Sequence, residues 1–339
     1  MNTETPPASG APDGAAENAG RRYDLLTMGR VSVDLYPNDI GVRLPEVSTF
    51  AKFLGGSATN VAVAAARYGR HTAVITRTGA DPFGDYIHQA LRRFGVDDHH
   101  VTSVPGLPTP VVFCEIFPPD DFPLYFYRYP KAPDLEIHEH ELDIGAIRNA
   151  RIFWVTGTGL SAEPSRSTTL TALRAREHAE HTVLDLDFRP MFWESTAEAR
   201  AVIGGAVEHA TVAIGNLDEC EVAVGTRDPD EAARALLDRG VRLAVVKQGP
   251  DGVLARTRDQ EVVAPPVRVD VVNGLGAGDA FGGALCHGLL AGWELDRVMA
   301  FANAAGALVA ARLACADAMP VEAEVEALLS EAAARGDRS

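Results

Sequence analysis

Cysteine is scarce in this sequence, with four residues in 339. They stand at positions 114, 220, 286 and 315 and form no C-x-x-C pair. So sparse a set excludes a disulfide framework and a zinc cage built from cysteines, and it fits a reducing compartment.

Long apolar runs are also missing. The longest candidates, after Asp279 and after Arg297, are interrupted by His287 and Asn303, whereas a membrane-spanning helix needs about 20 apolar residues. The N-terminus has neither a basic start nor an apolar run, so it does not resemble a secretory signal. We expect residues 1–21 to form a disordered tail and the protein to be cytoplasmic.

Basic residues are outnumbered, because 31 Lys and Arg stand against 47 Asp and Glu for a net charge of −16. A chain this acidic repels nucleic acid and anionic membranes, so neither is an expected partner. An anionic small molecule would need a local device such as a helix N-terminus, a few arginines or a metal ion. The hydrophobic types AVILMFWYC make up 46% of the chain, which is typical of a globular protein.

Segments of strand character alternate with helical segments along most of the chain. This order predicts an α/β fold in one domain over residues 22–332, with a mostly parallel sheet covered by helices on both faces. A hairpin pattern at 110–128 has no helix partner, so we expect a small β lid from segments at about 38–53 and 108–130. Residues 333–339 are expected to fray. The predicted strands are 23–29, 32–36, 72–79, 151–157, 182–187, 211–216, 241–249 and 252–257.

The most informative segment is VVNGLGAGDAFGGALCHGLL, residues 271–290. Its glycines allow a ligand to approach the backbone, and an apolar helix begins near Asp279. Free N–H groups and the positive end of the helix dipole then face an anion. In one interpretation Asp279 is a general base, beside amides of Gly276, Ala277 and Gly278 that stabilise a transferring phosphoryl group. In the other, Asp279 only caps a buried helix.

A second glycine pair precedes another helix. In LGGSATNVAVAAARYG, residues 54–69, Gly55 and Gly56 come before the helix and Asn60 lies in its first turn. The paired glycines let hydroxyl groups of a polyol reach the backbone, and Asn60 offers both a donor and an acceptor. Taken alone, the segment is also compatible with a simple strand-to-helix turn.

GGSATN and GLGAGDAF resemble, in this order and spacing, the two signature segments of the ribokinase or PfkB family of carbohydrate kinases. The resemblance extends from Tyr23 to about Ala332. It implies a Rossmann-like, ribokinase-like α/β domain with a β lid, ATP as donor, Mg²⁺ as cofactor, and transfer to a primary hydroxyl of a sugar. It also implies that Asp34, in GRVSVDLY, binds sugar hydroxyls together with Gly56 and Asn60.

The resemblance extends to segments on the nucleotide side. NLDE contains Asn216 and Glu219, and the family pattern implies that Glu219 helps to place Mg²⁺ through water. The resemblance also implies that VVKQGPDG borders the nucleotide and that Asn303 lies on the helix that flanks the adenine. The implied nucleotide-binding residues are Asn216, Lys247, Gly249, Gly252, Gly276, Gly278 and Asn303.

The chain departs from the family pattern at one place. Asn273, Gly274 and Leu275 stand where the family usually has Asp-Thr-Thr before Gly-Ala-Gly-Asp. Because a carboxylate and two hydroxyls are missing, we expect little or no activation by K⁺.

Four further segments resemble those of sugar-acid kinases, which implies a sugar acid as the substrate. They resemble segments of the kinases that phosphorylate 5-dehydro-2-deoxygluconate in myo-inositol breakdown, and DLDFRP also resembles kinases of 2-keto-3-deoxygluconate. These segments are PLYFYRY (123–129), GTGLSAEPSR (157–166), DLDFRPMFW (185–193) and ADAMP (316–320).

Two arginines favour the same class of substrate. Arg128 ends PLYFYR and Arg189 follows a strand in DLDFRP, and the carboxyl ends of strands line the ligand crevice of open α/β sheets. Two guanidiniums there would hold a carboxylate in bidentate fashion. Alternatively, Arg189 pairs with Asp185 or Asp187, and Arg128 pairs with a surface acid.

The sequence also contains features related to two other classes of function. WVTGTGLSA, residues 154–162, follows a strand with a G-x-G-x-x-A pattern, as in NAD-dependent dehydrogenases. Pro164 disfavours this interpretation, because it would open the following helix too late to face a phosphate. A non-catalytic sugar sensor would be expected to lack Asp279, which is present.

The lid pattern also predicts an assembly. PVVFCEIF and PLYFYR alternate apolar and polar residues, and an apolar strand pair left in water is an aggregation hazard. We therefore expect the lid to close over the sugar and to mediate a homodimer.

Overall fold

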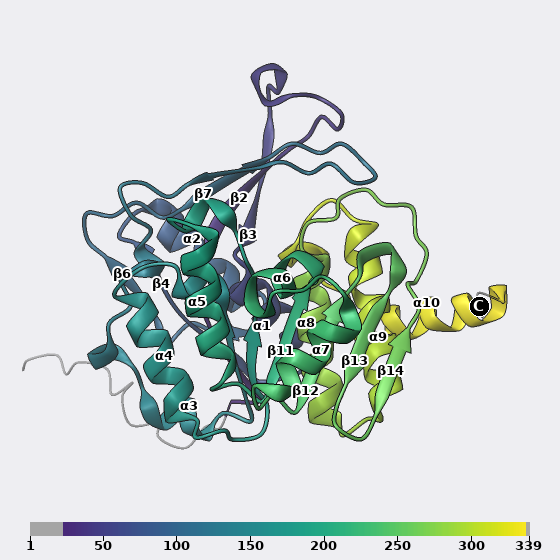
Figure 1. Ribbon diagram of the computed structural model, residues 1–339. Helices are drawn as coiled ribbons and strands as arrows, with labels where there is room; N and C mark the ends of the chain where they lie inside the picture. Colours follow the sequence, from purple (N-terminus) through teal and green to yellow (C-terminus); the bar gives the residue numbers. More distant parts are fainter. Residues whose placement is uncertain (1–22, 337–339) are drawn as a thin grey trace, which may run out of the picture.

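A ten-stranded, mostly parallel sheet forms the centre of the computed structural model, which describes residues 23–336 (Figure 1). The strands lie in the order β14-β13-β12-β11-β10-β9-β1-β4-β5, and β6 pairs with β4. Only the pairs β12–β13 and β13–β14 are antiparallel within the described sheet. The strands are β1 (Leu25–Met28), β4 (Thr72–Gly79), β5 (Val96–Asp97), β6 (Val101–Val104), β9 (Ile152–Thr156), β10 (Thr182–Asp185), β11 (Val212–Asn216), β12 (Leu243–Lys247), β13 (Val253–Arg256) and β14 (Glu261–Ala264).

Helices cover both faces of this sheet. One face carries α1 (Ser57–Arg67), α2 (Pro82–Arg93), α8 (Ala277–Ala291), α9 (Leu295–Ala310) and α10 (Glu322–Arg335). The other face carries α3 (Ile144–Asn149), α4 (Ser165–Ala175), α5 (Thr196–Val207), α6 (Leu217–Val224) and α7 (Pro229–Asp238). Short 3₁₀ turns are η1 (Leu44–Glu46), η2 (Pro133–Leu135), η3 (Glu139–Glu141), η4 (Gly157–Leu160), η5 (Pro190–Phe192), η6 (Gly249–Asp251) and η7 (Ala316–Ala318).

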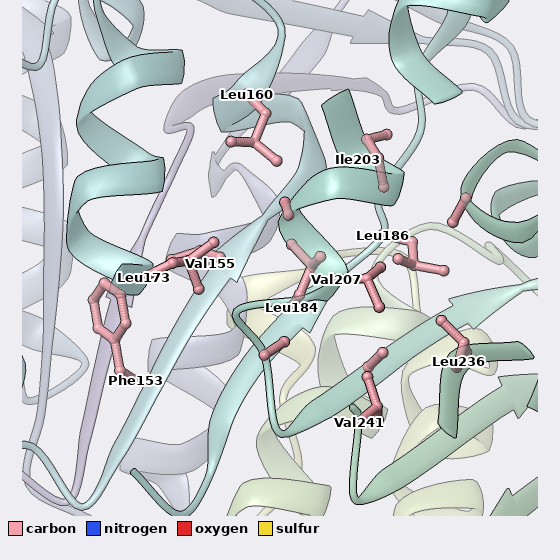
Figure 2. Close-up of a cluster of buried hydrophobic side chains, with 14 of the residues drawn as sticks. Phe153, Val155, Leu160, Leu173, Leu184, Leu186, Ile203, Val207, Leu236 and Val241 are labelled. Carbon is pink, nitrogen blue, oxygen red and sulfur yellow. The ribbon is translucent and has the colours of Figure 1, made fainter. Parts of the chain in front are cut away.

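The alternation of side chains along β9 shows how one apolar strand builds two cores. Phe153 and Val155 pack with the cluster under α3–α7, which Figure 2 shows together with Leu173 of α4. Ile152 and Trp154 face the opposite cluster under α1, α8 and α9. Because successive side chains of a strand point to opposite faces, a continuous apolar run is what a doubly covered sheet requires.

A separate four-stranded sheet projects above the main sheet in Figure 1. Its order is β3-β2-β7-β8, with β2 parallel to β7 and antiparallel to β3. The strands are β2 (Ser32–Pro37), β3 (Phe50–Gly55), β7 (Val111–Cys114) and β8 (Leu124–Tyr127). The expected α/β fold with a small additional sheet is confirmed, although this sheet also takes residues 32–37, which lie outside the segments expected for it.

The ends of the domain differ in part from expectation. Helix α10 continues to Arg335, past the start of the segment expected to fray at 333–339. Continued helix is consistent with Val325, which anchors α10 in the core beside α9. The predicted tail at 1–21 lies outside the described residues. Nowhere in 23–336 does a helix have the length and apolar character needed to cross a membrane.

Candidate active site

A cavity of about 230 Å³ lies where the carboxyl ends of the parallel strands meet the small sheet. The strand order reverses between the parallel strands β1 and β9, which makes this edge the topological switch point, the usual ligand site of open α/β sheets. Val112, Leu124 and Phe126 form the wall contributed by the small sheet. The polar and glycine residues of the lining are Arg30, Asp34, Tyr36, Gly56, Ser57, Asn60, Asp185, Asp187, Arg189, Asn216, Glu219, Lys247, Gly274, Gly276, Gly278 and Asp279.

Asp279 lies in the first turn of α8, and its Oδ2 accepts a 2.8 Å hydrogen bond from Nδ2 of Asn60 in α1. Burial raises the pKa of Asp279 to about 6, although the Asn60 hydrogen bond and the charge of Arg30 act in the opposite direction. A carboxylate with a pKa near 6 is ionised at neutral pH and is a stronger base than an exposed aspartate. The arrangement therefore suits abstraction of a hydroxyl proton.

Gly276 provides the turn that brings the start of α8 to the cavity. Its φ is 81°, and a Cβ there would lie 2.7 Å from Sγ of Cys315, so glycine is required both by conformation and by space. The first N–H groups of an α-helix have no partner within the helix. Those of Ala277 and Gly278, beside Asp279, are therefore suited to an anion.

The paired glycines before α1 are required by two close approaches. A Cβ on Gly55 would lie 2.0 Å from Oδ1 of Asp34, and a Cβ on Gly56 would lie 2.4 Å from the carbonyl oxygen of Arg30. Asp34 accepts hydrogen bonds from Oγ of Ser32 (2.7 Å) and the hydroxyl of Tyr36 (3.3 Å). Burial raises the pKa of Asp34, with the Ser32 hydrogen bond opposing it. Gly55 is thus needed to leave space for the Asp34 carboxylate, and it does not itself line the cavity.

Lys247 lies near Glu219 and Asp185 on the side of the cavity where the sequence predicts the nucleotide. Lys247 ends β12, and burial alone would lower its pKa, but the charges of Glu219 and Asp185 raise it. Burial raises the pKa of Asp185 well above its ordinary value, against the charge of Lys247. Among residues 23–336, Lys247 makes no direct ion pair or hydrogen bond, which leaves its ammonium group available to a phosphate.

Asn216 and Glu219 begin α6 as a reciprocal cap. Oδ1 of Asn216 accepts from the Glu219 amide at 2.9 Å, and Oε2 of Glu219 accepts from the Asn216 amide at 2.7 Å. Both residues line the cavity. Within the described chain, no group of three or more His, Cys, Asp or Glu side chains could enclose a metal ion. The oxygen atoms of Asn216 and Glu219 fit Mg²⁺ held through water and phosphate oxygens, the mode that this ion usually adopts.

Three other residues expected at the nucleotide lie outside the lining of this cavity. Gly249 begins η6 and Gly252 follows it, and a Cβ on Gly252 would lie 2.2 Å from the carbonyl oxygen of Ala264. Nδ2 of Asn303, in α9, donates to the carbonyl oxygen of Pro265 at 2.9 Å. These contacts give Gly252 and Asn303 a role in holding the segment after β14, and their nucleotide contacts stay a prediction.

Arg128 differs from expectation. Its guanidinium donates to both carboxylate oxygens of Asp134, at 2.5 and 3.2 Å, and both side chains are buried. Asp134 also accepts from the backbone amide of Val31 at 3.1 Å. Arg128 does not line the cavity, so in this structure it pairs with Asp134 and does not reach the substrate site. The alternative expectation of a pair with a surface acid also differs, because Asp134 is buried.

Arg189 does line the cavity, and its Nη2 lies 3.4 Å from Oδ1 of Asp187. Asp187 also accepts hydrogen bonds from Ser57 and Thr158, both at 2.8 Å. Burial alone would raise the pKa of Asp187, but the charges of Arg30 and Arg189 hold it below its ordinary value. The pairing of Arg189 with Asp187, one of the alternatives from the sequence, is thus present.

Sequence reasoning missed Arg30 and gave Asp187 no role of its own. Arg30 stands in GRVSVDLY, the segment quoted for Asp34, and follows β1 after Gly29. The rule that strand ends line the crevice would have selected it. The G-x-G-x-x-A segment is explained by packing, because a Cβ on Gly157 would lie 2.1 Å from the carbonyl oxygen of Leu186 and Thr158 supports Asp187.

A ribokinase-like sheet with a helix N-terminus, a buried base and a free lysine at one edge defines a class of phosphotransferases. The chain belongs to the pfkB family of carbohydrate kinases, whose model matches residues 23–322. It is therefore a sugar kinase, which confirms the enzyme class expected from the sequence and makes the dehydrogenase alternative wrong.

Individual relatives agree with this assignment. The chain is 33% identical over 315 residues to the 5-dehydro-2-deoxygluconokinase of Geobacillus kaustophilus, covering 91% of this chain and 94% of that protein. It is 31% identical over 319 residues to the protein of that name from Clostridium perfringens, covering 92% and 94%.

Solved structures share the fold. The fructokinase of Vibrio cholerae O395, in a fructose-, ADP- and calcium-bound form, is 26% identical with a TM-score of 0.79 and covers 91% of this chain and 99% of its own. A putative ribokinase II from E. coli in complex with ATP and Mg²⁺ has a TM-score of 0.83 at 21% identity, with 91% and 99% covered.

Proposed function

We propose that the protein transfers the γ-phosphoryl group of ATP to the terminal primary hydroxyl of a sugar acid, with 5-dehydro-2-deoxygluconate as the substrate. The observation that carries the proposed chemistry is Asp279, a buried base with a pKa of about 6 among the free amides of a helix start. The names of the curated relatives support the choice of substrate. A kinase of 2-keto-3-deoxygluconate is the alternative, since that substrate is also a keto-deoxy sugar acid.

In the proposed reaction, the acceptor hydroxyl gives its proton to the carboxylate of Asp279 as its oxygen attacks the γ-phosphorus. The bond from that phosphorus to the bridging oxygen of ADP breaks, and ADP leaves with the electron pair. Amides of Gly276, Ala277 and Gly278 stabilise the charge on the transferring group. Lys247 adds a fixed positive charge on the same side.

Mg²⁺ would neutralise phosphate charge in a protein whose own net charge is −16. Asn216 and Glu219 would hold it through water, because both line the cavity. Gly249, Gly252 and Asn303 would border the nucleotide beyond the cavity, as the family resemblance implies.

The sugar would lie between Asp34 and Asn60. Oδ1 of Asn60 is buried without a hydrogen-bond partner among the described residues, while its Nδ2 is used by Asp279. An unpaired buried acceptor is costly unless a donor reaches it. A sugar hydroxyl is such a donor, and Asp34 and the Gly56 backbone offer further partners to its neighbours.

The proposed function is tested by coupled ADP release with 5-dehydro-2-deoxygluconate, 2-keto-3-deoxygluconate, fructose and ribose. We expect the highest kcat/KM for 5-dehydro-2-deoxygluconate and no ADP release above background without sugar. Preference for 2-keto-3-deoxygluconate would keep the sugar-acid class and reject the named substrate. Preference for fructose or ribose would overturn the sugar-acid assignment.

A homodimer through the small sheet is part of the proposal. Phe50, Phe113 and Tyr127 form an aromatic row on β3, β7 and β8, with ring centroids 5.3 and 5.4 Å apart. Tyr127 is 63% exposed and Tyr129 is 85% exposed. Exposed aromatic rows of this kind mark interaction surfaces. A cytoplasmic location is also proposed, supported by four free, buried cysteines.

A further inference from the structure

Two buried guanidinium donors face the cavity without hydrogen-bond partners. Within residues 23–336, Nε of Arg30 and Nε of Arg189 are both buried and make no hydrogen bond, although Nε of Arg30 lies within ion-pair distance of Asp187. Both side chains line the cavity. A buried N–H group without a hydrogen-bond acceptor is unfavourable, so two such groups at one wall indicate a ligand that accepts hydrogen bonds there.

Asp187 lies between the two guanidiniums and fixes their positions. Its Oδ2 is 3.6 Å from Nε of Arg30, and its Oδ1 is 3.4 Å from Nη2 of Arg189. Asp187 itself is held by Ser57 and Thr158 and has a φ of 25°, an unusual value for a residue other than glycine. Such a conformation persists only where its surroundings enforce it.

Arg30, Asp187 and Arg189 form a local group of charges, and Glu219, Asp279 and Asp185 also act on Arg189. Two guanidiniums share one aspartate, and the pKa of Asp187 is held low against burial by their charges, so it stays ionised. Arg30, Asp187 and Arg189 together carry one net positive charge, which one additional carboxylate would neutralise. Arg128 offers no such net charge, because it is matched one to one by Asp134.

We propose that Arg30 and Arg189 together form the subsite for the carboxylate of the substrate, and that Arg128 is not part of it. This inference rests on the proposed function, since it needs a sugar acid as substrate. It goes beyond that function by naming the residues that bind the carboxylate, at the end of the sugar opposite the reacting hydroxyl. The guanidinium carbon of Arg30 lies 5.8 Å from the centroid of the Phe126 ring of β8, so the small sheet borders the subsite.

The test compares two substrates of nearly the same size and shape, 5-dehydro-2-deoxygluconate and its primary carboxamide, of which only the acid carries a negative charge. For the wild-type enzyme we expect kcat/KM to favour the acid. In Arg30→Gln this preference should fall about 10- to 100-fold, through a higher KM for the acid, because a hydrogen bond to a charged group is lost. The kcat/KM for the amide should change much less.

Arg189→Gln is the second variant and should lower the same preference, and it serves if Arg30→Gln does not fold. Arg92→Gln is the matched control, since it removes the same charge from an arginine that is 68% exposed on α2. It should keep the wild-type preference. Thermal unfolding of each variant confirms that the folded proteins are compared.

The outcomes separate this inference from the proposed function. A wild-type enzyme that releases ADP only with neutral sugars overturns both. A wild-type enzyme that prefers the acid, with the preference unchanged in folded Arg30→Gln and Arg189→Gln, overturns the carboxylate subsite alone. Equal losses for acid and amide in both variants would also reject it, because they would show general disruption of the site.

Discussion

Asn60 and Asp279, 219 residues apart in the chain, are joined by a 2.8 Å hydrogen bond between the first turns of α1 and α8. The bond brings the two signature segments together at one point of the cavity. It also orients the carboxylate and stabilises its ionised form against the effect of burial.

Replacing Asp279 by Asn should abolish most of the turnover. The amide keeps the size of the side chain but cannot accept the hydroxyl proton, so kcat should fall about 10²- to 10⁴-fold. Binding of ATP, measured by calorimetry, should persist. Asp296→Asn, at an exposed aspartate in the first turn of α9, is the control and should retain activity. Near wild-type turnover of Asp279→Asn would remove this residue as the base.

The pH profile should report the same carboxylate. Because Asp279 must be ionised to act as a base and its pKa is about 6, kcat/KM should fall as the pH drops below about 6. In Asn60→Ala the hydrogen bond that favours the ionised form is gone, so the pKa should rise and the acidic limb should move to higher pH. An acidic limb that stays in place or moves to lower pH would contradict this coupling.

Much of this site follows from local sequence signals. Gly55, Gly56 and Gly276 were predictable because each marks a place where the backbone must pass close to another group, and the structure identifies Asp34, Arg30 and Cys315 as those groups. The β strands before these turns were predictable from apolar runs, because a doubly covered sheet needs them.

The partners of the arginines were not predictable in the same way. Arg128 and Arg189 both follow strands, yet Arg128 pairs with Asp134 while Arg189 faces the cavity. The difference arises because Asp134, in η2, packs beside the end of β8, and no periodicity in the sequence indicates that contact. Tertiary pairing of charges therefore decides which strand-end arginine is free for a ligand.

The Mg²⁺ dependence should shift in Glu219→Gln. The amide oxygen can still cap α6 through the Asn216 backbone, so the helix should remain, but the negative charge near the phosphates is lost. The Mg²⁺ concentration for half-maximal rate should rise about 10-fold or more, as for other outer-sphere metal partners. Glu231→Gln, in the first turn of α7, is a control. An unchanged Mg²⁺ response would exclude Glu219 from metal placement.

Arg128→Gln should act on stability more than on substrate binding. Removing one partner of a buried ion pair leaves Asp134 uncompensated and should lower the free energy of unfolding by about 3–5 kcal/mol. The exposed pair of Arg92 predicts a loss of about 1 kcal/mol or less for Arg92→Gln. Urea unfolding measures both. Unchanged stability with a 10-fold higher KM for the sugar acid would show that Arg128 binds the substrate.

The small sheet should hold two protomers together. Along β8, Leu124 and Phe126 line the cavity, while Tyr125 and Tyr127 alternate with them and are 41% and 63% exposed. One face of the strand is thus used by the site, and the other presents aromatic surface that a second copy of the same sheet would bury. The expected mass from light scattering at micromolar concentration is therefore twice the 36.1 kDa of one chain.

A charge placed on that outer face should dissociate the dimer. In Tyr127→Asp, two buried carboxylates would have no partner in the interface, and desolvation of such charges is costly. Val263→Asp is the control, because Val263 is 64% exposed on β14, at the far edge of the main sheet, and its substitution should leave the mass unchanged. If the wild-type protein is a monomer at micromolar concentration, or if Tyr127→Asp remains a dimer, the assembly does not form through this face.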